Sequence, residues 1–313
     1  MPIGYNSSFA MPPTFLLIGI PGLQGGTFWL SIIFCAIYIL SVMGNCAVFY
    51  IIKTEKSLQG PMYFFLSMLA VNDVVMPSSI VPKMMGIFWF GAGQIDAPSC
   101  LAQMFFVNSF CAVTSGVLTA MAYDRYVAIC FPLRYVSVFT NALLVKLVAA
   151  IVVRAIVIIL PIPLMVLRLR FCTNTVISHS YCDHMAVVNL SCSDTHINNI
   201  YGIVAVLCTM VTDLTLIGLS YAMILREVYK LSSTHARHKA LGTCGSHVCV
   251  IIVAYFPLAF SAITYRIGQN RIPQSVHVFF ADVYIILTVF LDPLIYGLKT
   301  KQIRERNFST FWR

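Results

Sequence analysis

The sequence predicts an all-α membrane protein built as a bundle of seven transmembrane helices. Mean hydropathy is +0.86, and of the 313 residues 59% are apolar and only 10% are charged, whereas about a quarter of a typical soluble domain is charged. No charged residue precedes Lys53. Seven apolar stretches reach the length of about 20 residues that a helix needs to cross a bilayer. A soluble enzyme, a nucleic-acid-binding protein and a disordered chain are therefore excluded.

Charged and turn residues separate these seven stretches. We expect the membrane spans at 27–52, 61–86, 99–123, 142–166, 197–225, 240–265 and 275–298. The chain then divides into an N-terminal segment (1–26), a helical domain (27–298) and an amphipathic tail (299–313).

The basic residues predict the orientation of the bundle, because cytoplasmic loops are enriched in Lys and Arg. With the N-terminus outside, 14 of the 20 Lys and Arg residues face the cytoplasm and 5 face outward, while Arg154 lies within a span. We therefore expect an extracellular N-terminus, a cytoplasmic C-terminus and a multi-pass protein of the plasma membrane. The same asymmetry explains the net charge of +9 without a nucleic-acid partner.

Two N-glycosylation sequons fall on the outer side of this topology. They begin at Asn6 and Asn189, and a third, at Asn307, falls on the inner side and should stay unmodified.

Four of the eleven cysteines lie on the outer side, where oxidising conditions favour disulfides. They are Cys100, Cys172, Cys182 and Cys192. An even number indicates two disulfides, but spacing alone leaves three pairings open. The run HSYCDH at 179–184 could instead bind a metal, since it offers two imidazoles, a thiol and a carboxylate. A disulfide would consume Cys182, so we expect no metal site.

Several ionisable side chains lie inside the spans, where a charge is costly and usually has a partner. They are Asp73, Arg154, Asp213, Asp282 and Asp292. Asp73 lies near the middle of the second span, close in depth to Asn45 in the first, and Asp292 lies toward the inner end of the seventh. These three residues could hold a cation such as sodium. The alternative is a structural hydrogen-bond network in which burial partly neutralises Asp73.

The triplet Asp124-Arg125-Tyr126 ends the third span on the cytoplasmic side. A neighbouring carboxylate can hold a guanidinium in one state and release it in another. The 25 residues from Cys100 to Arg125 rise about 37 Å as a helix, so the two lie at opposite membrane faces. We therefore expect this triplet to act in a cytoplasmic switch.

The triplet also belongs to a wider pattern. Together with Gly44-Asn45, LAVND at 69–73 and DPLIY at 292–296, it resembles a rhodopsin-like G-protein-coupled receptor. More specific runs resemble odorant receptors: PMYFFL at 61–66, MAYDRYVAIC at 121–130, PLRY at 132–135, Ser220-Tyr221 and KALGTCGSH at 239–247. FLLIGIPGL at 15–23 and KTKQIR at 299–304 are similar to the class I, fish-like branch. The resemblance extends from about residue 14 to 306.

The resemblance implies a function and partners. Such a receptor binds small volatile ligands in a pocket on the extracellular side and activates a stimulatory G protein, which raises cyclic AMP. It lies in the lipid bilayer, catalyses no reaction and carries no cofactor. The resemblance also implies the disulfides Cys100–Cys182 and Cys172–Cys192.

Two residues depart from the general receptor pattern. Tyr255 replaces a Trp two residues before Pro257 in the sixth span, as odorant receptors allow, so we expect Tyr255 to move that span. Asp292 replaces an Asn before the proline of the seventh span and adds an acid to the inner cluster. Tyr296, which ends the same motif, is expected to act in the activation switch with Tyr255.

Candidate ligand contacts lie in the outer half of the spans. Arg266 follows Pro257 by nine residues, His184 follows Cys182 by two, and Asn108 lies about two turns into the third span. A guanidinium beside an apolar cavity favours a carboxylate, because its planar fork matches two oxygens.

Other roles for Arg266 stay open at this point. It could be solvated or pair with a rim carboxylate of Asp183, Asp194 or Asp282. Because class I receptors that resemble this chain commonly take small carboxylic acids, we expect Arg266 to bind such a ligand, with His184 and Asn108 as auxiliary donors.

Rival functions lack the residues that they need. A retinal-linked sensor requires a Lys in the seventh span, and 275–298 contains none. An aminergic receptor would resemble families with an acid in the third span near 107–109, which reads VNS. A transporter would favour internal repeats, and the two halves show none. A receptor for a non-odorant small metabolite is the alternative that remains.

Overall fold

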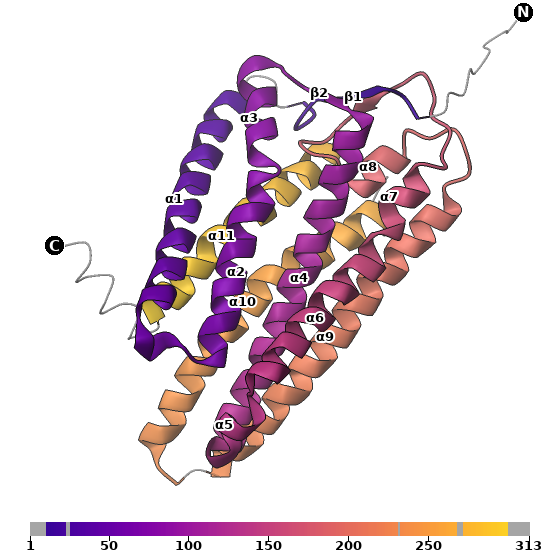
Figure 1. Cartoon of the computed structure of the whole chain (residues 1–313). Coiled ribbons are helices and arrows are strands. Elements are labelled where there is room, and N and C mark those ends of the chain that lie inside the picture. Colours follow the sequence, from indigo (N-terminus) through magenta and orange to yellow (C-terminus); the bar gives the residue numbers. More distant parts are fainter. Residues whose placement is uncertain (1–10, 23–25, 231, 268–271, 300–313) are drawn as a thin grey trace, which may run out of the picture.

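Seven long apolar helices form the bundle, which confirms the predicted fold class (Figure 1). The computed structural model describes residues 11–22, 26–230, 232–267 and 272–299, and for residues 27, 236, 239, 243, 257, 261–267 and 297–299 it describes the backbone alone. The sequon at Asn6 and nearly all of the expected tail 299–313 lie outside these residues. The spans are α1 (Thr27–Thr54), α2 (Pro61–Ser78) with α3 (Val81–Phe90), α4 (Ala97–Cys130), α6 (Asn141–Ile159) with α7 (Pro161–Val166), α9 (His196–Lys230), α10 (Thr234–Ile267) and α11 (Gln274–Lys299).

Proline residues and caps set several helix boundaries. Pro161 and Pro163 have no backbone N–H to donate to the preceding turn, and the fourth span accordingly breaks between α6 and α7. Pro82 lies in the first turn of α3, where its missing N–H leaves no helical hydrogen bond unmade. The Asp96 carboxylate caps α4 by accepting a hydrogen bond from the Ser99 N–H at 3.0 Å.

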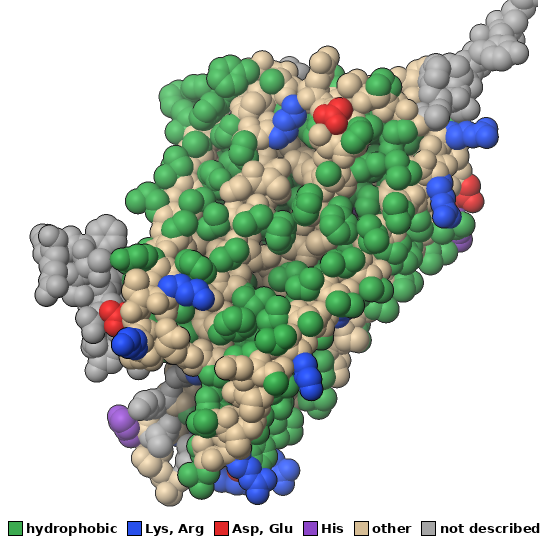
Figure 2. All heavy atoms as spheres, viewed as in Figure 1, with side chains coloured by type: hydrophobic (Ala, Val, Ile, Leu, Met, Phe, Trp, Pro, Cys, Tyr) green, Lys and Arg blue, Asp and Glu red, His purple; other side chains and the backbone are tan. Residues whose placement is uncertain are grey.

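Helix α4 is the central helix of the bundle. It packs against α2, α6, α7, α9 and α10. Hydrophobic side chains cover the flank of the molecule, and Lys, Arg, Asp and Glu lie toward its two ends (Figure 2). This distribution suits a bundle whose flank contacts lipid.

One end of the bundle is closed by a small sheet and a long loop. Strand β1 (Thr14–Leu17) lies between β2 (Gln94–Asp96), antiparallel to it, and β3 (Val176–Ile177), parallel to it. Phe15 and Leu17 point into the bundle and are each 1% exposed. Gly93 is required here, because a Cβ would lie 2.0 Å from the Leu17 carbonyl oxygen. We call the loop 167–195 the lid and this end of the bundle the lid end. The opposite end is the Arg125 end.

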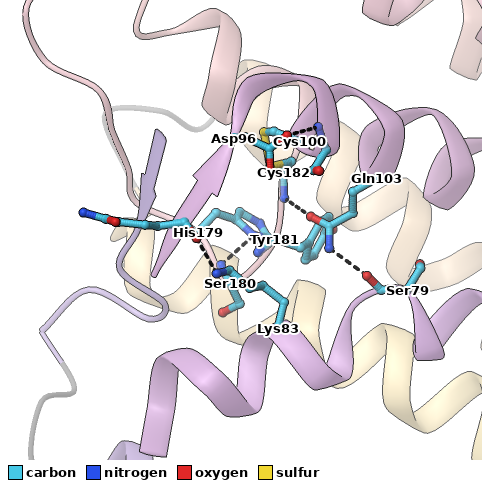
Figure 3. Close-up of a disulfide and its surroundings, with 11 residues drawn as sticks. Ser79, Lys83, Asp96, Cys100, Gln103, His179, Ser180, Tyr181 and Cys182 are labelled. Carbon is cyan, nitrogen blue, oxygen red and sulfur yellow. Dashed lines mark hydrogen bonds between the residues drawn. A yellow bond between two sulfur atoms is a disulfide. The ribbon is translucent and has the colours of Figure 1, made fainter. Parts of the chain in front are cut away.

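Two disulfides cross-link the lid end. Cys100 of α4 is bonded to Cys182, and Cys172 is bonded to Cys192 within the loop, with Cα atoms 5.4 Å apart in each case. This is the pairing that the resemblance implies. Figure 3 shows the first disulfide beside the loop segment 179–182.

Candidate functional site

A cavity of about 70 Å³ lies among α4, the α6–α7 span, α9 and α10. Its walls are mostly aliphatic, with polar contributions from Asn108, Ser115, Thr209 and Tyr255. Established ligand pockets measure about 300–1,000 Å³. A ligand of more than a few heavy atoms therefore has to displace surrounding side chains.

The three expected ligand contacts occupy different positions. Asn108 lines the cavity and donates from Nδ2 to the Met104 carbonyl oxygen at 2.8 Å. His184 begins the short helix α8 (His184–Val188) in the lid; it is buried but does not line the cavity. Arg266 belongs to the last turn of α10, and its side chain lies outside the described residues.

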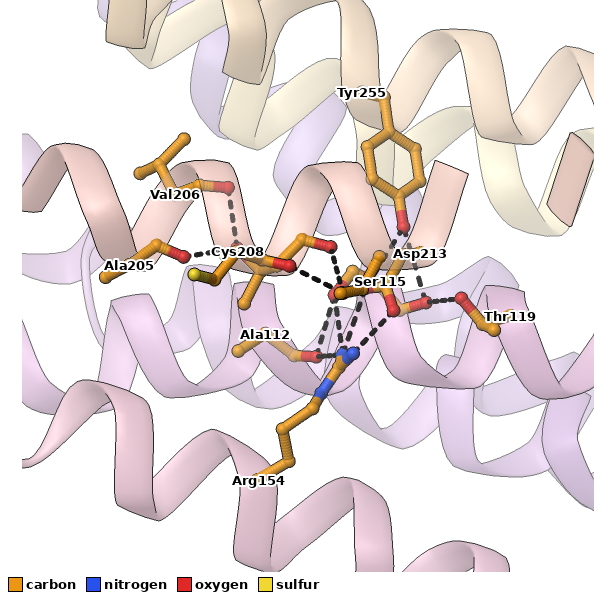
Figure 4. Close-up of polar contacts among 11 residues, drawn as sticks. Ala112, Ser115, Thr119, Arg154, Ala205, Val206, Cys208, Asp213 and Tyr255 are labelled. Atoms are coloured by element: carbon orange, nitrogen blue, oxygen red, sulfur yellow. Dashed lines mark hydrogen bonds and ion pairs between the residues drawn. The ribbon is translucent and has the colours of Figure 1, made fainter. Parts of the chain in front are cut away.

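An ion pair lies directly beneath the cavity (Figure 4). Nη1 of Arg154 (α6) is 2.5 Å from Oδ1 of Asp213 (α9), and Nη2 is 3.0 Å from Oδ2. Nη2 also donates to the Ala112 carbonyl oxygen and to Oγ of Ser115, both on α4. The Asp213 side chain is fully buried and that of Arg154 is 28% exposed. Bidentate geometry and additional acceptors are what a charge pair needs inside a bundle.

Tyr255 of α10 connects the cavity with this ion pair. Its hydroxyl lies 3.5 Å from Oδ2 of Asp213 and 3.4 Å from the Ser115 carbonyl oxygen, and its ring lines the cavity. A ligand that pushes Tyr255 would therefore disturb contacts with α4 and α9. The expected switch role of Tyr255 remains a prediction.

Besides its disulfides, the lid is fastened to α4 and α11 by hydrogen bonds. Gln103 of α4 donates from Nε2 to the Ser79 carbonyl oxygen at 2.8 Å and accepts from the Cys182 N–H at 2.9 Å (Figure 3). Ser180 donates from Oγ to Asp282 of α11 at 2.7 Å. These bonds hold the loop against the ends of α4 and α11.

His179 is fully buried in the lid. Its Nδ1 accepts hydrogen bonds from the N–H groups of Ser180 and Tyr181, and its ring packs edge-on against Tyr181 at 4.3 Å. Burial lowers the pKa of His179 to about 4, so the ring is neutral at physiological pH. Within the described chain, no group of three or more His, Cys, Asp or Glu side chains has the arrangement of a metal site.

The rim carboxylates that were alternative partners for Arg266 already accept other hydrogen bonds. Asp183 caps α8 through the N–H groups of Met185 and Ala186. Asp194 accepts from the N–H of His196 at 2.9 Å, and Asp282 accepts from Ser180 as above. The sequon residue Asn189 is exposed just after α8.

At the Arg125 end, the structure gives Asp124 a different partner from the expected one. Its buried carboxylate accepts a hydrogen bond from the Tyr135 hydroxyl at 2.7 Å, and no ion pair with Arg125 occurs among the described contacts. Burial, and then this carboxylate, raise the pKa of Tyr135. The Tyr126 ring meets Phe131 edge-on at 5.7 Å.

Side-chain hydrogen bonds join α9 and α10 in the same region, including one from Nη2 of Arg237 to the Tyr229 carbonyl oxygen at 3.4 Å. The Tyr221 hydroxyl and Nδ1 of His247 are 2.7 Å apart. Tyr296 of α11 is buried, and its hydroxyl has no hydrogen-bond partner within the described chain.

Two acidic residues of the inner cluster lie together. Asp73 and Asp292 are each 2% exposed and within hydrogen-bonding reach of one another. Both oxygens of Asp292 and one of Asp73 have no donor among the described residues. Asn45 donates to the Val289 carbonyl oxygen at 2.9 Å, one turn before Asp292 on α11. Adjacent buried carboxylates need a shared proton or a cation.

Comparison with known proteins identifies the family. Residues 34–312 match the family model described as "Olfactory receptor". The chain is 48% identical over 306 residues to human olfactory receptor 52P1, covering 98% of this chain and 95% of that one. It is 46% identical over 308 residues to human olfactory receptor 52K1 and 45% identical over 307 residues to human olfactory receptor 52J3, covering 98% of both chains in each case.

These receptors are multi-pass proteins of the plasma membrane and are not enzymes. Their similarity extends over nearly the whole chain. The chain therefore belongs to the olfactory receptor family of G-protein-coupled receptors, in the class I group that contains subfamily 52.

Proposed function

We propose that this olfactory receptor binds small volatile carboxylic acids at the lid end and activates a stimulatory G protein, which raises cyclic AMP. The observation that carries the proposal is the aliphatic cavity beside Tyr255 and beneath the lid. The cavity accepts the alkyl tail of the acid. Arg266 binds the carboxylate, since it follows the cavity residue Leu258 by eight positions, about 12 Å along α10.

The proposed orientation places the lid end outside the cell. The excess of Lys and Arg in the loops of the other end supports it, as do two disulfides, which form in oxidising compartments. Arg125 then faces the cytoplasm, where the G protein binds. A preference of the ligand for the active arrangement by about 1–3 kcal/mol would give about 5- to 150-fold coupling.

A cyclic AMP assay in cells tests this function. The probes are an acid, an alcohol, an aldehyde and an amine of equal chain length, followed by an acid series of increasing length. We expect the acid to be the most potent, and potency to rise with each methylene, worth at most about 0.8 kcal/mol, until the cavity is full. Equal potency of acid and alcohol would refute acid recognition. Responses confined to non-volatile metabolites would favour the alternative receptor class.

In the same assay, Arg266→Ala tests the contribution of the carboxylate head group separately from that of the alkyl tail. Loss of a buried charge-assisted contact costs about 2–5 kcal/mol, so acid responses should disappear while surface expression persists. Arg266→Lys should recover part of the response, because an ammonium lacks the planar fork. Smaller losses are expected for His184→Ala and Asn108→Ala. Unchanged acid potency in Arg266→Ala would place the head group elsewhere.

We also propose that Asp73 and Asp292 hold a sodium ion, with Asn45 nearby. The unpaired carboxylate oxygens of the pair support this. Replacing sodium by N-methylglucamine at constant ionic strength should lower the unfolding temperature of the wild type but not that of Asp73→Asn. Asp96→Asn, on an exposed cap, is the control. A wild type insensitive to the exchange would leave a shared proton as the explanation.

A further inference from the structure

The guanidinium of Arg154 reaches Asp213 past a glycine of α4. A Cβ placed on Gly116 would lie 3.2 Å from Nη2 of Arg154, and 2.9 and 3.0 Å from side-chain atoms of Ile151. Both approaches are closer than ordinary van der Waals contact. Gly116 therefore leaves the gap through which a side chain of α6 crosses α4 to meet α9.

The ion pair is separated from the cavity by a single layer of residues. Ala112 and Ser115 line the cavity and also accept hydrogen bonds from Nη2 of Arg154. Tyr255 lines the cavity and contacts Oδ2 of Asp213. Charges at this depth act strongly on a ligand, because little water screens them.

We propose that Arg154, admitted by Gly116, determines which ligand charge the cavity accepts. While the pair is complete, the carboxylate and the guanidinium cancel, and the floor of the cavity is electrically neutral. Without the guanidinium, the Asp213 carboxylate would favour an ammonium group and oppose an acid. Without the carboxylate, the guanidinium would do the reverse.

This inference uses only one part of the proposed function, namely that ligands occupy this cavity. It does not require the natural ligand to be an acid, since it concerns a change in preference. The two ideas therefore fail separately: the wild-type ranking tests the function, and the change between variants tests the role of Arg154.

The test compares Arg154→Gln, Asp213→Asn and the double variant Arg154→Gln/Asp213→Asn. The probes are hexylamine, hexanoic acid and hexanol, applied in the cyclic AMP assay and in thermal unfolding of purified receptor. The quantity measured is the ratio of amine to acid potency or affinity within one variant. That ratio cancels any common effect of a substitution on signalling or expression.

Arg154→Gln should shift this ratio at least about tenfold toward the amine, and Asp213→Asn should shift it by a similar factor toward the acid. The double variant should return to the wild-type ratio, and hexanol should change little throughout. Gly116→Ala should shift the ratio in the direction of Arg154→Gln, but less, because it displaces the guanidinium without removing it.

Ratios that stay at the wild-type value in both single variants would overturn the inference. It would equally be overturned if the single variants failed to fold while the double variant folded and the ratio in Gly116→Ala stayed unchanged. The ion pair would then serve stability alone.

Discussion

The two ends of the bundle are held together by different kinds of contact. The lid end has two disulfides, a three-stranded sheet and hydrogen bonds from the loop to α4 and α11. At the Arg125 end, individual side-chain hydrogen bonds connect the elements. Examples are Tyr221 to His247, between α9 and α10, and Tyr135 to Asp124. A covalent link persists through a conformational change, whereas a hydrogen bond worth about 1 kcal/mol can be exchanged.

This difference suits a receptor that senses at one end and signals at the other. In the proposed function the lid end stays in place, and a ligand in the cavity acts mainly on Tyr255 and on the helix α10 that carries it. The weakly tied end of α10 is then free to move away from α9. Helix movement of this kind converts a small local change into a two-state response.

Removing the charge at the signalling end should have the largest effect. We expect Arg125→Ala to abolish the cyclic AMP response, because the proposed function places this residue against the G protein and away from the ligand, while ligand-induced thermal stabilisation persists. Arg134→Ala, an exposed basic residue on the same end, is the matched control and should retain most of the response. Full signalling by Arg125→Ala would remove it from the switch.

Removing the disulfides of the lid should affect folding rather than signalling. Replacing Cys100 and Cys182 together by Ser should cost about 2–4 kcal/mol and lower the surface expression of the receptor. Cys172 and Cys192 close a shorter loop and should matter less. Cys208→Ser, at an exposed free thiol, should express like the wild type. Normal expression and stability after loss of the first disulfide would mean that the sheet alone fastens the lid.

Low pH should destabilise the lid through protonation of His179. Its pKa is about 4 in the folded state against 6.5 without burial, so the stability that the neutral ring provides is complete above about pH 6.5 and is lost as pH falls toward 4. The loss amounts to at most about 3 kcal/mol. Unfolding temperature against pH should fall less steeply in His179→Asn, which keeps an acceptor for the backbone, than in the wild type or in the exposed control His196→Asn. If the unfolding temperature falls equally with pH in the wild type and in His179→Asn, groups other than His179 are responsible for the loss of stability at low pH.

The smallest effect on signalling should come from removing the Tyr221–His247 hydrogen bond between α9 and α10. Tyr221→Phe removes one hydrogen bond worth about 0.5–1.5 kcal/mol and should raise basal cyclic AMP by a factor of about 2–10. Tyr50→Phe, on the exposed face of α1, should leave basal signalling unchanged. A basal level that falls in Tyr221→Phe would mean that this bond supports the active arrangement.

Much of the fold was predictable because hydropathy and length alone define membrane spans. The position of Arg125 at the end of the third span followed from the same spans, as did the possibility of a polar cluster of Asn45, Asp73 and Asp292. The sheet was not predictable, since Thr14–Leu17 pairs with two strands that are distant in the chain. No periodicity in so short a segment indicates a strand.

The ion pair shows where the sequence was informative but incomplete. Arg154 and Asp213 were both visible as charges within spans, and two opposite charges at similar depth could have suggested a pair. Whether they meet depends on helix rotation and on the gap at Gly116, which only the assembled bundle supplies. The bond of Asp124 to Tyr135 likewise depends on how the loop after α4 folds back.

Hydrogen exchange of the purified receptor, with and without its most potent ligand, tests most directly whether ligand binding near the lid end changes the structure of the Arg125 end. We predict that ligand raises amide exchange at the start of α10, in peptides from 234–247, and leaves exchange in the lid peptides 172–192 unchanged or slower. Ligand-induced change confined to the lid, with α10 exchanging as before, would contradict the account.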